Sequence, residues 1–328
     1  MNIFVTGGAG YVGSHCVRGL CDAGHQVAVY DNLAKGHRRS VDERATLIVG
    51  DLADAPLLNQ TLTRGNFDAV MHFAAFAEVG ESVSHPLLYY RNNVINSVSL
   101  LEAMRAAEVR KLVFSSTCAI YGVPRAVPIT EDMPHDPINP YGRTKLAIEW
   151  ALQDSMKGWG LGATALRYFN AAGASPDGSI GEDHDPESHL IPRVLKVALG
   201  QADGVKIFGI DYPTPDGSCV RDYVHVADLA EIHRVAIETQ EEKQFRCYNV
   251  GTGQGVSVKE VIDAAREITG HEIPAAPAPR RDGDPPELYA DPTKITTDLA
   301  WDPKYTDIRA TIQTAWNWHR NHPDGFAS

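Results

Sequence analysis

The sequence predicts an α/β fold in which helices cover both faces of a doubly wound parallel sheet, joined to a smaller α/β lobe. Three observations predict it. Short apolar runs alternate with longer helical patterns over the first half of the chain. A glycine-rich turn follows the first of these runs. Beyond residue 170 the alternation gives way to long segments rich in Gly, Pro, Ser and Asp, which in a compact enzyme often bind substrate.

Six runs have the nearly continuous hydrophobicity of parallel strands that are buried on both faces. They are Ile3–Thr6, Gln26–Tyr30, Thr46–Val49, Ala69–Phe73, Lys111–Ser115 and Ala163–Arg167. Helical patterns lie between them near 12–22, 54–63, 86–107 and 140–157, and later at 190–199, 227–239 and 257–269. Asp54 is a suitable N-cap ahead of Pro56, and Gly24 is placed to end the first helix.

The first strand runs directly into Thr6-Gly7-Gly8-Ala9-Gly10-Tyr11-Val12-Gly13, which opens a helix. Gly7 permits a tight turn, Gly10 lets the backbone approach a pyrophosphate, and Gly13 allows close packing of helix on strand. The helix N-terminus offers N–H groups and the positive end of its dipole to phosphates. Strand, glycines and helix in this order favour a Rossmann-type dinucleotide site over a plain connecting turn.

Acidic residues follow the second and third strands. Asp31 lies about 20 residues beyond the glycines, where a carboxylate accepts hydrogen bonds from a ribose diol. It would repel a 2′-phosphate and so favours NAD over NADP, although Lys35 is close in sequence. Asp51, with Leu52, suits the adenine edge, and a capping role for Asp51 is an open alternative.

Tyr141 and Lys145 are four residues apart, on one face of a helix that Pro140 begins. A free tyrosine has a pKa of about 10, and a nearby ammonium with the positive nicotinamide ring would lower it toward neutral pH. Thr117, at the end of the preceding strand, is placed to hold the reacting hydroxyl. A surface Tyr–Lys pair and a satisfied strand-end hydroxyl are the alternatives. Together the three residues indicate hydride transfer from a secondary alcohol.

Composition narrows the class further. With 43% hydrophobic residues and a formal net charge of -12, the chain suits a globular protein and lacks the positive surface that nucleic acids or anionic membranes require. The five cysteines form no CxxC pair, so we expect a reducing compartment. No signal peptide or membrane-spanning run is recognisable, which predicts a cytoplasmic protein. No Cys/His cluster has metal-ligand spacing, so no metal is expected.

These motifs are similar to those of the extended short-chain dehydrogenase/reductase family, and within it to the UDP-sugar 4-epimerases, over essentially the whole chain. The segments that carry the resemblance are Thr6–Gly13 with Ser14-His15, Asp31-Asn32, Phe73–Ala75, Val79–Ser82, Asn92–Val94, Tyr121-Gly122, Tyr141–Lys145, Arg167–Asn170, Phe208–Thr214 and Arg221–Val226. The last two are the most specific, since a Tyr–Lys pair alone identifies only the superfamily.

The resemblance implies an isomerase that interconverts UDP-galactose and UDP-glucose through a transient 4-keto sugar, with hydride passed to and from tightly bound NAD. It makes Tyr141 the catalytic base, Lys145 the residue that orients the nicotinamide ribose, and Thr117 the partner of the sugar O4. The implied cofactor residues are Gly7, Gly10, Tyr11, Val12, Gly13, Asp31, Asn32, Asp51, Leu52, Phe73, Ala74, Ala75, Asn92, Tyr141, Lys145 and Phe169. The implied substrate residues are Thr117, Asn170, His189, Leu190, Lys206, Ile207, Phe208, Arg221, Arg281, Asp284 and Leu288.

Two positions depart from the family pattern. Ala77 stands where relatives often carry a lysine near the cofactor. Leu288 occupies the sugar-pocket gate, where a tyrosine excludes N-acetyl groups and a smaller residue admits them. A UDP-N-acetylglucosamine or UDP-pentose 4-epimerase therefore stays open. A nucleotide-sugar 4,6-dehydratase is disfavoured because Thr117 is followed by Cys118-Ala119 rather than an Asp-Glu pair, and a non-catalytic NAD-binding protein has little need for the three reactive residues.

We expect residues 1–170 to form the NAD-binding Rossmann domain, with 221–250 as a segment that can return to it, and residues 171–328 to form the UDP-sugar-binding lobe. Relatives commonly pair as homodimers through helices of the first domain. The corresponding stretches here are 86–107 and 140–157.

Overall fold

The computed structural model describes residues 1–281 and 284–326. The chain forms two compact units that interleave along the sequence. Unit 1 comprises Met1–Gly122, Pro134–Arg167 and Ala230–Tyr248, and unit 2 comprises Val123–Met133, Tyr168–Leu229 and Asn249–Ser328. Within the described residues, none of the helices combines the length and apolar character needed to cross a membrane.

Unit 1 is built on a seven-stranded sheet with the order β11-β6-β5-β4-β1-β2-β3. Its strands are β1 (Asn2–Thr6), β2 (Gln26–Asp31), β3 (Thr46–Val49), β4 (Ala69–His72), β5 (Lys111–Thr117), β6 (Gly162–Tyr168) and β11 (Phe245–Val250). Strand β1 pairs in parallel with both β2 and β4, and β2–β3 and β4–β5 are parallel as well. The strand order reverses between β1 and β4, which is the switch point where doubly wound sheets bind dinucleotides.

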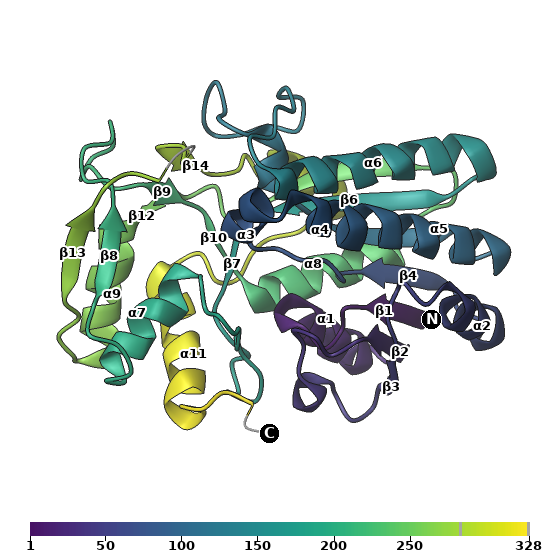
Figure 1. The fold of residues 1–328 in the computed structure, drawn as a ribbon, viewed down its shortest axis with the longest axis horizontal. Coiled ribbons are helices and arrows are strands. Elements are labelled where there is room, and N and C mark those ends of the chain that lie inside the picture. Colours follow the sequence, from purple (N-terminus) through teal and green to yellow (C-terminus); the bar gives the residue numbers. More distant parts are fainter. Residues whose placement is uncertain (282–283, 327–328) are drawn as a thin grey trace. The chain divides into compact units, whose positions relative to one another are not determined.

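Helices cover the sheet of unit 1 on both faces (Figure 1). They are α1 (Tyr11–Asp22), α2 (Ala55–Gly65), α3 (Val79–Ser84), α4 (Pro86–Tyr89), the π-helix η2 (Tyr90–Ile95), α5 (Asn96–Ala106), α6 (Pro140–Trp159) and α8 (Val226–Glu238), with short 3-10 turns η1 (Arg38–Ser40) and η3 (Cys118–Tyr121). Leu58 of α2, Leu100 of α5 and Ile148 of α6 share one core with the strands. Helices α1 and α8 lie together on the other face, where Gly19 approaches Ala230. Burial on both faces accounts for the continuous apolar strands.

All six predicted strands are confirmed, with ends that shift by at most two residues. Asp54 caps α2 by accepting a hydrogen bond from the Leu57 amide, as predicted. The helix predicted over 86–107 is confirmed as a continuous helical stretch from Pro86 to Ala106, in which the π-helical segment Tyr90–Ile95 lies between α4 and α5. Strand β11 was not predicted, because polar Arg246 and Asn249 interrupt its apolar pattern.

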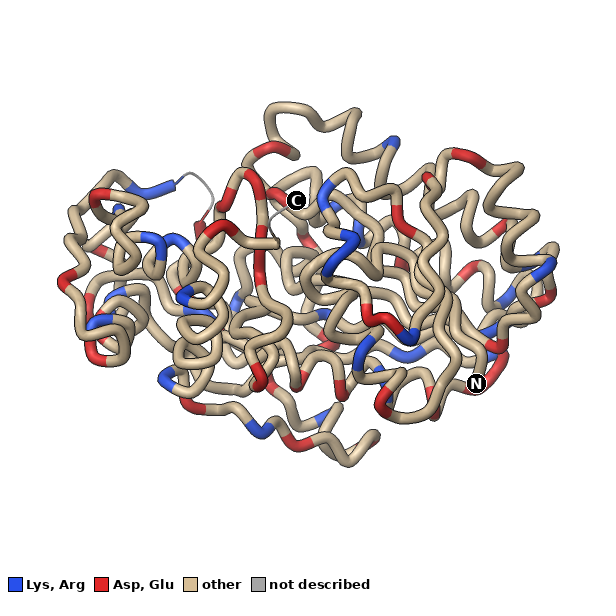
Figure 2. Tube along the Cα trace, turned by 90° about the horizontal axis from the view of Figure 1, so that it is seen from below, with Lys and Arg blue, Asp and Glu red and all other residues tan. Residues whose placement is uncertain are grey.

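Unit 2 combines short strands with four helices among the residues described. They are β7 (Asn170–Ala172), β8 (Val205–Phe208), β9 (Val220–Arg221), β10 (Tyr223–His225), β12 (Val256–Ser257), β13 (Ala275–Ala278), β14 (Glu287–Leu288), α7 (Leu190–Ala198), α9 (Val258–Thr269), α10 (Thr293–Leu299) and α11 (Ile308–Asn321). The strands form three small sheets, β10-β7, β12-β9-β14 and β13-β8. Val194, Ile262 and Ile312 join α7, α9 and α11 in a core of their own. Acidic and basic residues are interspersed along the traced chain (Figure 2).

Candidate active site and cofactor pocket

The glycine turn after β1 has the geometry that close packing demands. Gly7 has φ +72, and a Cβ there would lie 2.4 Å from the Ala74 amide nitrogen. A Cβ at Gly13 would lie 2.2 Å from the Gly7 carbonyl oxygen, so α1 can pack this tightly only with glycine. At Gly10 a Cβ would meet only the Gly7 oxygen, at 3.4 Å. The protein itself therefore leaves the space beside Gly10 open, as a bound pyrophosphate requires.

A pocket that is partly open to solvent lies at the switch point of the unit 1 sheet. Its lining is Gly7, Tyr30, Asp31, Asn32, Gly50, Asp51, Leu52, Ala74, Asn92 and Asn96. Seven of these were predicted as cofactor residues, whereas Tyr30, Gly50 and Asn96 were not. Tyr30 and Gly50 directly precede the predicted Asp31 and Asp51, so strand-end position alone was the signal that could have found them.

Hydrogen bonds fix the carboxylates of this pocket. Asp31 accepts from the Ala9 amide at 3.0 Å and from the Leu33 amide at 2.8 Å, which ties the end of β2 to the glycine turn. Asp51 accepts from the Asn32 side chain at 2.8 Å and also closes its own turn through the Ala53 amide. Asp51 thus lines the pocket while stabilising a turn, so the two roles weighed for it are compatible.

The π-helix brings Asn92 into the lining and buries its neighbour Asn93. Asn93 exchanges two hydrogen bonds with the backbone of Phe76, at 2.9 and 3.0 Å, and donates to Thr144 Oγ1 at 3.2 Å. It thereby fastens the segment after β4, which carries the predicted Phe73, Ala74 and Ala75, to helix α6. Sequence reasoning did not assign Asn93 this role, because it depends on neighbours distant in sequence.

The end of β5 and the start of α6 bring the predicted reactive residues together. Thr117 is 7% exposed and its hydroxyl accepts from the Ala119 amide at 3.1 Å. Asn139 caps α6 by accepting from the Gly142 amide at 2.8 Å. A Cβ at Gly142 would lie 2.6 Å from the Ala119 oxygen. Only glycine therefore lets the first turn of α6, which carries Tyr141, approach the turn that follows Thr117.

Lys145 of the same helix is 2% exposed. Its Nζ donates to the Ser115 carbonyl oxygen at 2.8 Å and lies 4.9 Å from the Phe114 ring centroid and 5.9 Å from that of Tyr141. Burial lowers the pKa of Lys145 to about 7. A negative charge beside the ammonium would favour its charged form and raise this pKa again.

A buried ionic network supports the same strand end. The Glu149 carboxylate accepts from Arg167 at 2.7 and 3.0 Å and from Ser116 at 2.6 Å, and Arg167 also donates to the Tyr121 hydroxyl at 2.8 Å. The side chains of Arg167 and Glu149 are 2% and 0% exposed. Ser116 directly precedes Thr117, so this network connects α6, β5 and β6 at the point where the reactive hydroxyl lies.

Several predicted substrate residues gather within unit 2. Arg221 on β9 pairs with Asp284 at 2.9 Å, and Leu288 on β14 lies opposite Arg221 in the parallel ladder. The Arg281 guanidinium stacks 4.0 Å above the ring of Phe208 on β8. The loop Arg280–Asp284, which carries the predicted substrate residues Arg281 and Asp284, is described only at its ends, because residues 282–283 lie outside the described part of the chain.

The remaining predicted substrate residues occupy other elements of unit 2. Asn170 begins β7, His189 immediately precedes α7, Leu190 is its first residue, and Lys206 and Ile207 belong to β8. Although burial opposes protonation, Glu182 and Glu187 raise the pKa of His189 well above its ordinary value. Phe169, expected at the cofactor, is buried in unit 2 just before β7.

The segment Arg221–Val226 contains both a predicted substrate residue, Arg221, and a structural residue, Asp222. It follows Arg221 but is fully buried, and it accepts hydrogen bonds from the amides of Thr252, Gly253 and Ala290 at 2.9, 3.1 and 3.2 Å. This carboxylate organises the backbone next to β14. Burial raises its pKa although each of these hydrogen bonds opposes the rise.

The fold and the group formed by Thr117, Tyr141 and Lys145 define a class, namely Rossmann-fold proteins equipped for NAD-linked oxidation of a secondary alcohol. Residues 3–251 match the model of the NAD dependent epimerase/dehydratase family, and the chain belongs to this family. The resemblance predicted from the motifs is thereby confirmed.

Full-length relatives sharpen the comparison. The chain is 53% identical over 329 residues to a UDP-glucose 4-epimerase of Halalkalibacterium halodurans, covering 100% of this chain and 98% of that protein. A crystal structure of a UDP-glucose 4-epimerase matches with a TM-score of 0.97 at 49% identity, covering 100% of both chains. The enzyme from Brucella ovis, solved in complex with NAD, matches with a TM-score of 0.92 at 46% identity, over 96% of this chain and 97% of that one.

Proposed function

We propose that the protein is a UDP-glucose 4-epimerase that interconverts UDP-galactose and UDP-glucose with NAD as its cofactor. The observation that carries the chemistry is the joint placement of Thr117, Tyr141 and Lys145 at the end of β5. The nature of the sugar nucleotide rests on the full-length similarity to UDP-glucose 4-epimerases. We further propose that unit 1 carries the NAD-binding domain, predicted as residues 1–170 with 221–250 returning to it, and that unit 2 carries the UDP-sugar-binding lobe, predicted as residues 171–328.

NAD, when bound, supplies the hydride acceptor and then the hydride donor at C4 of the sugar. The protein has to move the O4 proton in step with that transfer. We assign this role to the Tyr141 phenolate, which accepts the proton as C4 is oxidised and returns it as the 4-keto sugar is reduced. The Lys145 ammonium stabilises the phenolate and the Thr117 hydroxyl orients O4. Electrons and protons balance, because each is removed once and returned once.

The cofactor residues proposed here combine the glycine turn, the pocket lining and the segment after β4. They are Gly7, Gly10, Tyr11, Val12, Gly13, Asp31, Asn32, Asp51, Leu52, Phe73, Ala74, Ala75, Asn92 and Phe169, with Tyr141 and Lys145 at the nicotinamide end. Asp31 would accept hydrogen bonds from the adenosine ribose, which disfavours a 2′-phosphate there. Ala77 is exposed beside Glu78, which lies 3.7 Å from Lys35, so a cation reaches this neighbourhood from another loop.

The substrate must be held by its UDP part while the hexose stays free to present either face. We therefore propose that unit 2 binds the UDP part of the substrate, away from the reacting C4 atom. The residues proposed for this are Asn170, His189, Leu190, Lys206, Ile207, Phe208, Arg221, Arg281, Asp284 and Leu288. Arg221 and Arg281 supply the guanidinium groups suited to phosphate oxygens.

The test is Tyr141→Phe, which keeps the ring and removes the titrating hydroxyl. We expect kcat with UDP-galactose to fall by about 10²–10⁴-fold, while the amount of NAD released on denaturation stays at the wild-type level. Tyr90→Phe, at a 39% exposed tyrosine, is the matched control and should leave kcat unchanged. Near-normal turnover of Tyr141→Phe would remove Tyr141 from its assigned role.

The range of sugars that the protein accepts depends on the side chain at position 288. We propose that Leu288 leaves room for hexoses that carry an N-acetyl group as well as for those that do not. Wild type should convert UDP-GalNAc as well as UDP-galactose without added NAD, and Leu288→Tyr should lose the UDP-GalNAc activity selectively. UDP-arabinose in the same assay tests the pentose alternative. Equal product ratios in wild type and variant would contradict a gating role for Leu288.

We also propose a homodimer formed through helices of unit 1. Val83, Leu87, Ile95, Val98 and Trp150 on α3, α4, η2, α5 and α6 are 62, 80, 58, 41 and 57% exposed, an apolar series that association would cover. Sedimentation velocity should give twice the chain mass for wild type and a monomer for Leu87→Asp. Ile210→Asp, at an exposed apolar residue of unit 2, should remain dimeric.

The proposed location is the cytoplasm. All five cysteines, Cys16, Cys21, Cys118, Cys219 and Cys247, are thiols, as a reducing compartment would keep them. Recovery of the protein with an extracytoplasmic fraction of its own cells would contradict this proposal.

A further inference from the structure

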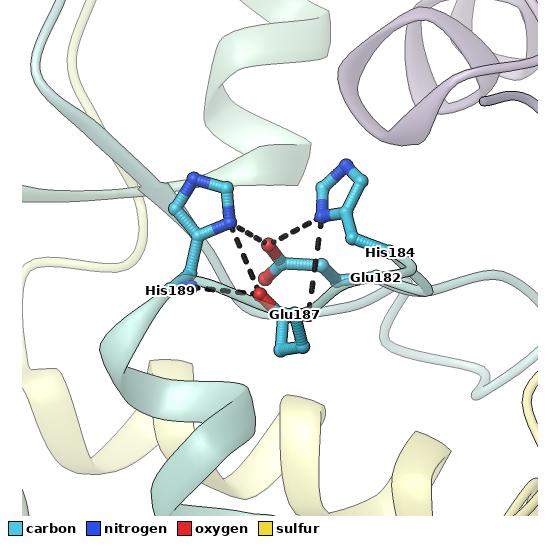
Figure 3. A group of neighbouring side chains, drawn as sticks. All are labelled: Glu182, His184, Glu187 and His189. Atoms are coloured by element: carbon cyan, nitrogen blue, oxygen red, sulfur yellow. Dashed lines mark hydrogen bonds and ion pairs between the residues drawn. The ribbon is translucent and has the colours of Figure 1, made fainter. Parts of the chain in front are cut away.

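One eight-residue segment of unit 2 gathers four side chains that can bind a metal just ahead of helix α7. They are Glu182, His184, Glu187 and His189 (Figure 3). Each offers one ligand atom, a ring nitrogen or a carboxylate oxygen, and these four atoms all lie within 4.8 Å of one another. The expectation of no metal overlooked this group, because it considered clusters of Cys and His and not a segment in which Glu and His alternate.

The distances between the ligand atoms suit a tetrahedral ion. The Nδ1 of His184 lies 3.1 Å from Glu182 Oε1 and 3.9 Å from Glu187 Oε2. The Nδ1 of His189 lies 2.7 Å from Glu182 Oε1 and 3.3 Å from Glu187 Oε1. A tetrahedral zinc ion with bonds of about 2.0–2.1 Å separates its ligand atoms by about 3.3 Å. The observed distances, from 2.7 to 3.9 Å, lie on both sides of that value.

The burial and the charge of the four side chains also favour a bound cation. The side chains of Glu182 and Glu187 are each 4% exposed, which distinguishes them from a solvated acidic surface. With both imidazoles deprotonated, as metal coordination requires, the two carboxylates leave a charge of minus two, and one divalent cation balances it. Burial lowers the pKa of the nearby His319, so that residue adds no charge at neutral pH. His184 and His189 are 29 and 48% exposed, which leaves a path from solvent.

A backbone hydrogen bond orients one of the four ligands, Glu187. The backbone amide of His189 donates to Glu187 Oε1 at 2.7 Å, and both imidazoles turn their Nδ1 atoms toward the two carboxylates (Figure 3). Ordered partners of this kind are typical of protein metal sites.

We propose that Glu182, His184, Glu187 and His189 form a closed tetrahedral site for a divalent transition-metal ion, with Zn²⁺ as the best match. Two nitrogen and two oxygen ligands at four-fold coordination suit zinc, whereas calcium and magnesium prefer six or more oxygen ligands. All four ligands come from the protein, so the site is structural rather than catalytic. It would fasten the long loop before α7 to the start of that helix, where the proposed substrate residues His189 and Leu190 lie.

The experiment is calorimetric titration of the chelator-treated, full-length protein with ZnCl₂, with no substrate present. Wild type should bind one ion per chain. His184→Gln removes a ligand that has no assigned part in substrate binding, and it should weaken Zn²⁺ affinity by more than about 100-fold, since loss of an outer partner alone costs about 10–100-fold. His271→Gln, the same change at an exposed histidine of unit 2, should bind as wild type does.

Two further measurements separate the site from adventitious binding. Zn²⁺ should raise the Tm of wild type and of His271→Gln but not that of His184→Gln, each compared with its own metal-free Tm. Co²⁺ in place of zinc should give wild type the intense visible absorption of a tetrahedral ion, and this band should be absent from His184→Gln. Equal Zn²⁺ affinity in all three proteins, or no binding by wild type, would overturn the proposal without bearing on the proposed epimerase activity.

Discussion

The reactive residues of unit 1 and the proposed nucleotide-binding residues of unit 2 are held in different ways. In unit 1, Lys145 and Thr117 are nearly inaccessible, and their polar groups bond to backbone atoms of the strand and turn that carry them. In unit 2, Arg221 and its partner Asp284 retain 13 and 30% side-chain exposure, and Arg281 is exposed above the Phe208 ring.

The difference follows from what each group has to do. Proton transfer needs a phenol, an ammonium and a hydroxyl at fixed separations, so their surroundings are buried and specific before substrate arrives. A diphosphate has to be captured and released, so its arginines are held by contacts that phosphate can replace. Substitutions in the first region should therefore change stability strongly, whereas those in the second should change affinity at little cost in stability.

The largest effect on stability is expected for Glu149→Ala. This change leaves the Arg167 guanidinium buried without its carboxylate, which costs about 3–5 kcal/mol of unfolding free energy. Urea unfolding followed by circular dichroism measures it. Asp211→Ala in unit 2 breaks an Arg280 ion pair whose partners are 45 and 72% exposed, and should cost less than about 1 kcal/mol. Similar losses in the two variants would show that burial does not distinguish the regions.

Gly142→Ala tests the close approach of α6 to the turn after Thr117. The added methyl would lie 2.6 Å from the Ala119 oxygen and must displace the helix start that carries Tyr141. We expect a loss of about 1–3 kcal/mol of stability and a fall in kcat of about 10²-fold. Gly158→Ala, in the same helix but with nothing within 4 Å of its Cβ, should stabilise the protein slightly and leave kcat unchanged. If both variants behave alike, the approach at Gly142 is not what positions Tyr141.

The sequence sufficed where a residue's role is set by its neighbours along the chain. Gly13 packs against its own turn, Asp31 ends its own strand, and Tyr141 and Lys145 share one helix. Strands buried on both faces are readable for the same reason, because their hydrophobicity is continuous. Each of these features depends on local spacing, which the sequence displays.

Roles that depend on contacts between distant segments could not be read in advance. Gly142 is required by the Ala119 oxygen, Asn93 by the backbone of Phe76, and Glu149 by Arg167. The short strands of unit 2, such as β9 and β14 with two residues each, show too few positions for a period of two. The pairing of β9 with β14, which places Leu288 opposite Arg221, is visible only in the folded structure.

The pH dependence of stability is a third test of the buried region. Because burial lowers the pKa of Lys145 to about 7, the folded ligand-free protein binds fewer protons than the unfolded chain between pH 7 and about 10. The buried Lys145 therefore destabilises the folded protein most below pH 7, and this destabilisation decreases as the pH rises from 7 to about 10. From pH 7 to 9 we expect Lys145 to contribute a gain of about 2 kcal/mol, which Lys145→Met abolishes. Lys157→Met, at an exposed position of the same helix, should retain the wild-type slope in urea unfolding.

The smallest change in stability, with a clear change in affinity, is expected for Arg281→Ala. A cation over an aromatic ring at an exposed site contributes about 0.5–1 kcal/mol, so the loss of the Phe208 contact should lie in that range. A guanidinium hydrogen-bonded to phosphate contributes more, about 1.5–3 kcal/mol, so inhibition by UDP should weaken by about 10–100-fold.

The matched control is Arg280→Ala, because the Arg280 guanidinium is occupied by Asp211 at 2.8 Å and by the Tyr212 ring at 4.2 Å. Inhibition constants for UDP would assign the anchor to Arg280 instead if only the control lost affinity. The contrast between the two units would fail if Arg281→Ala lost stability without losing affinity.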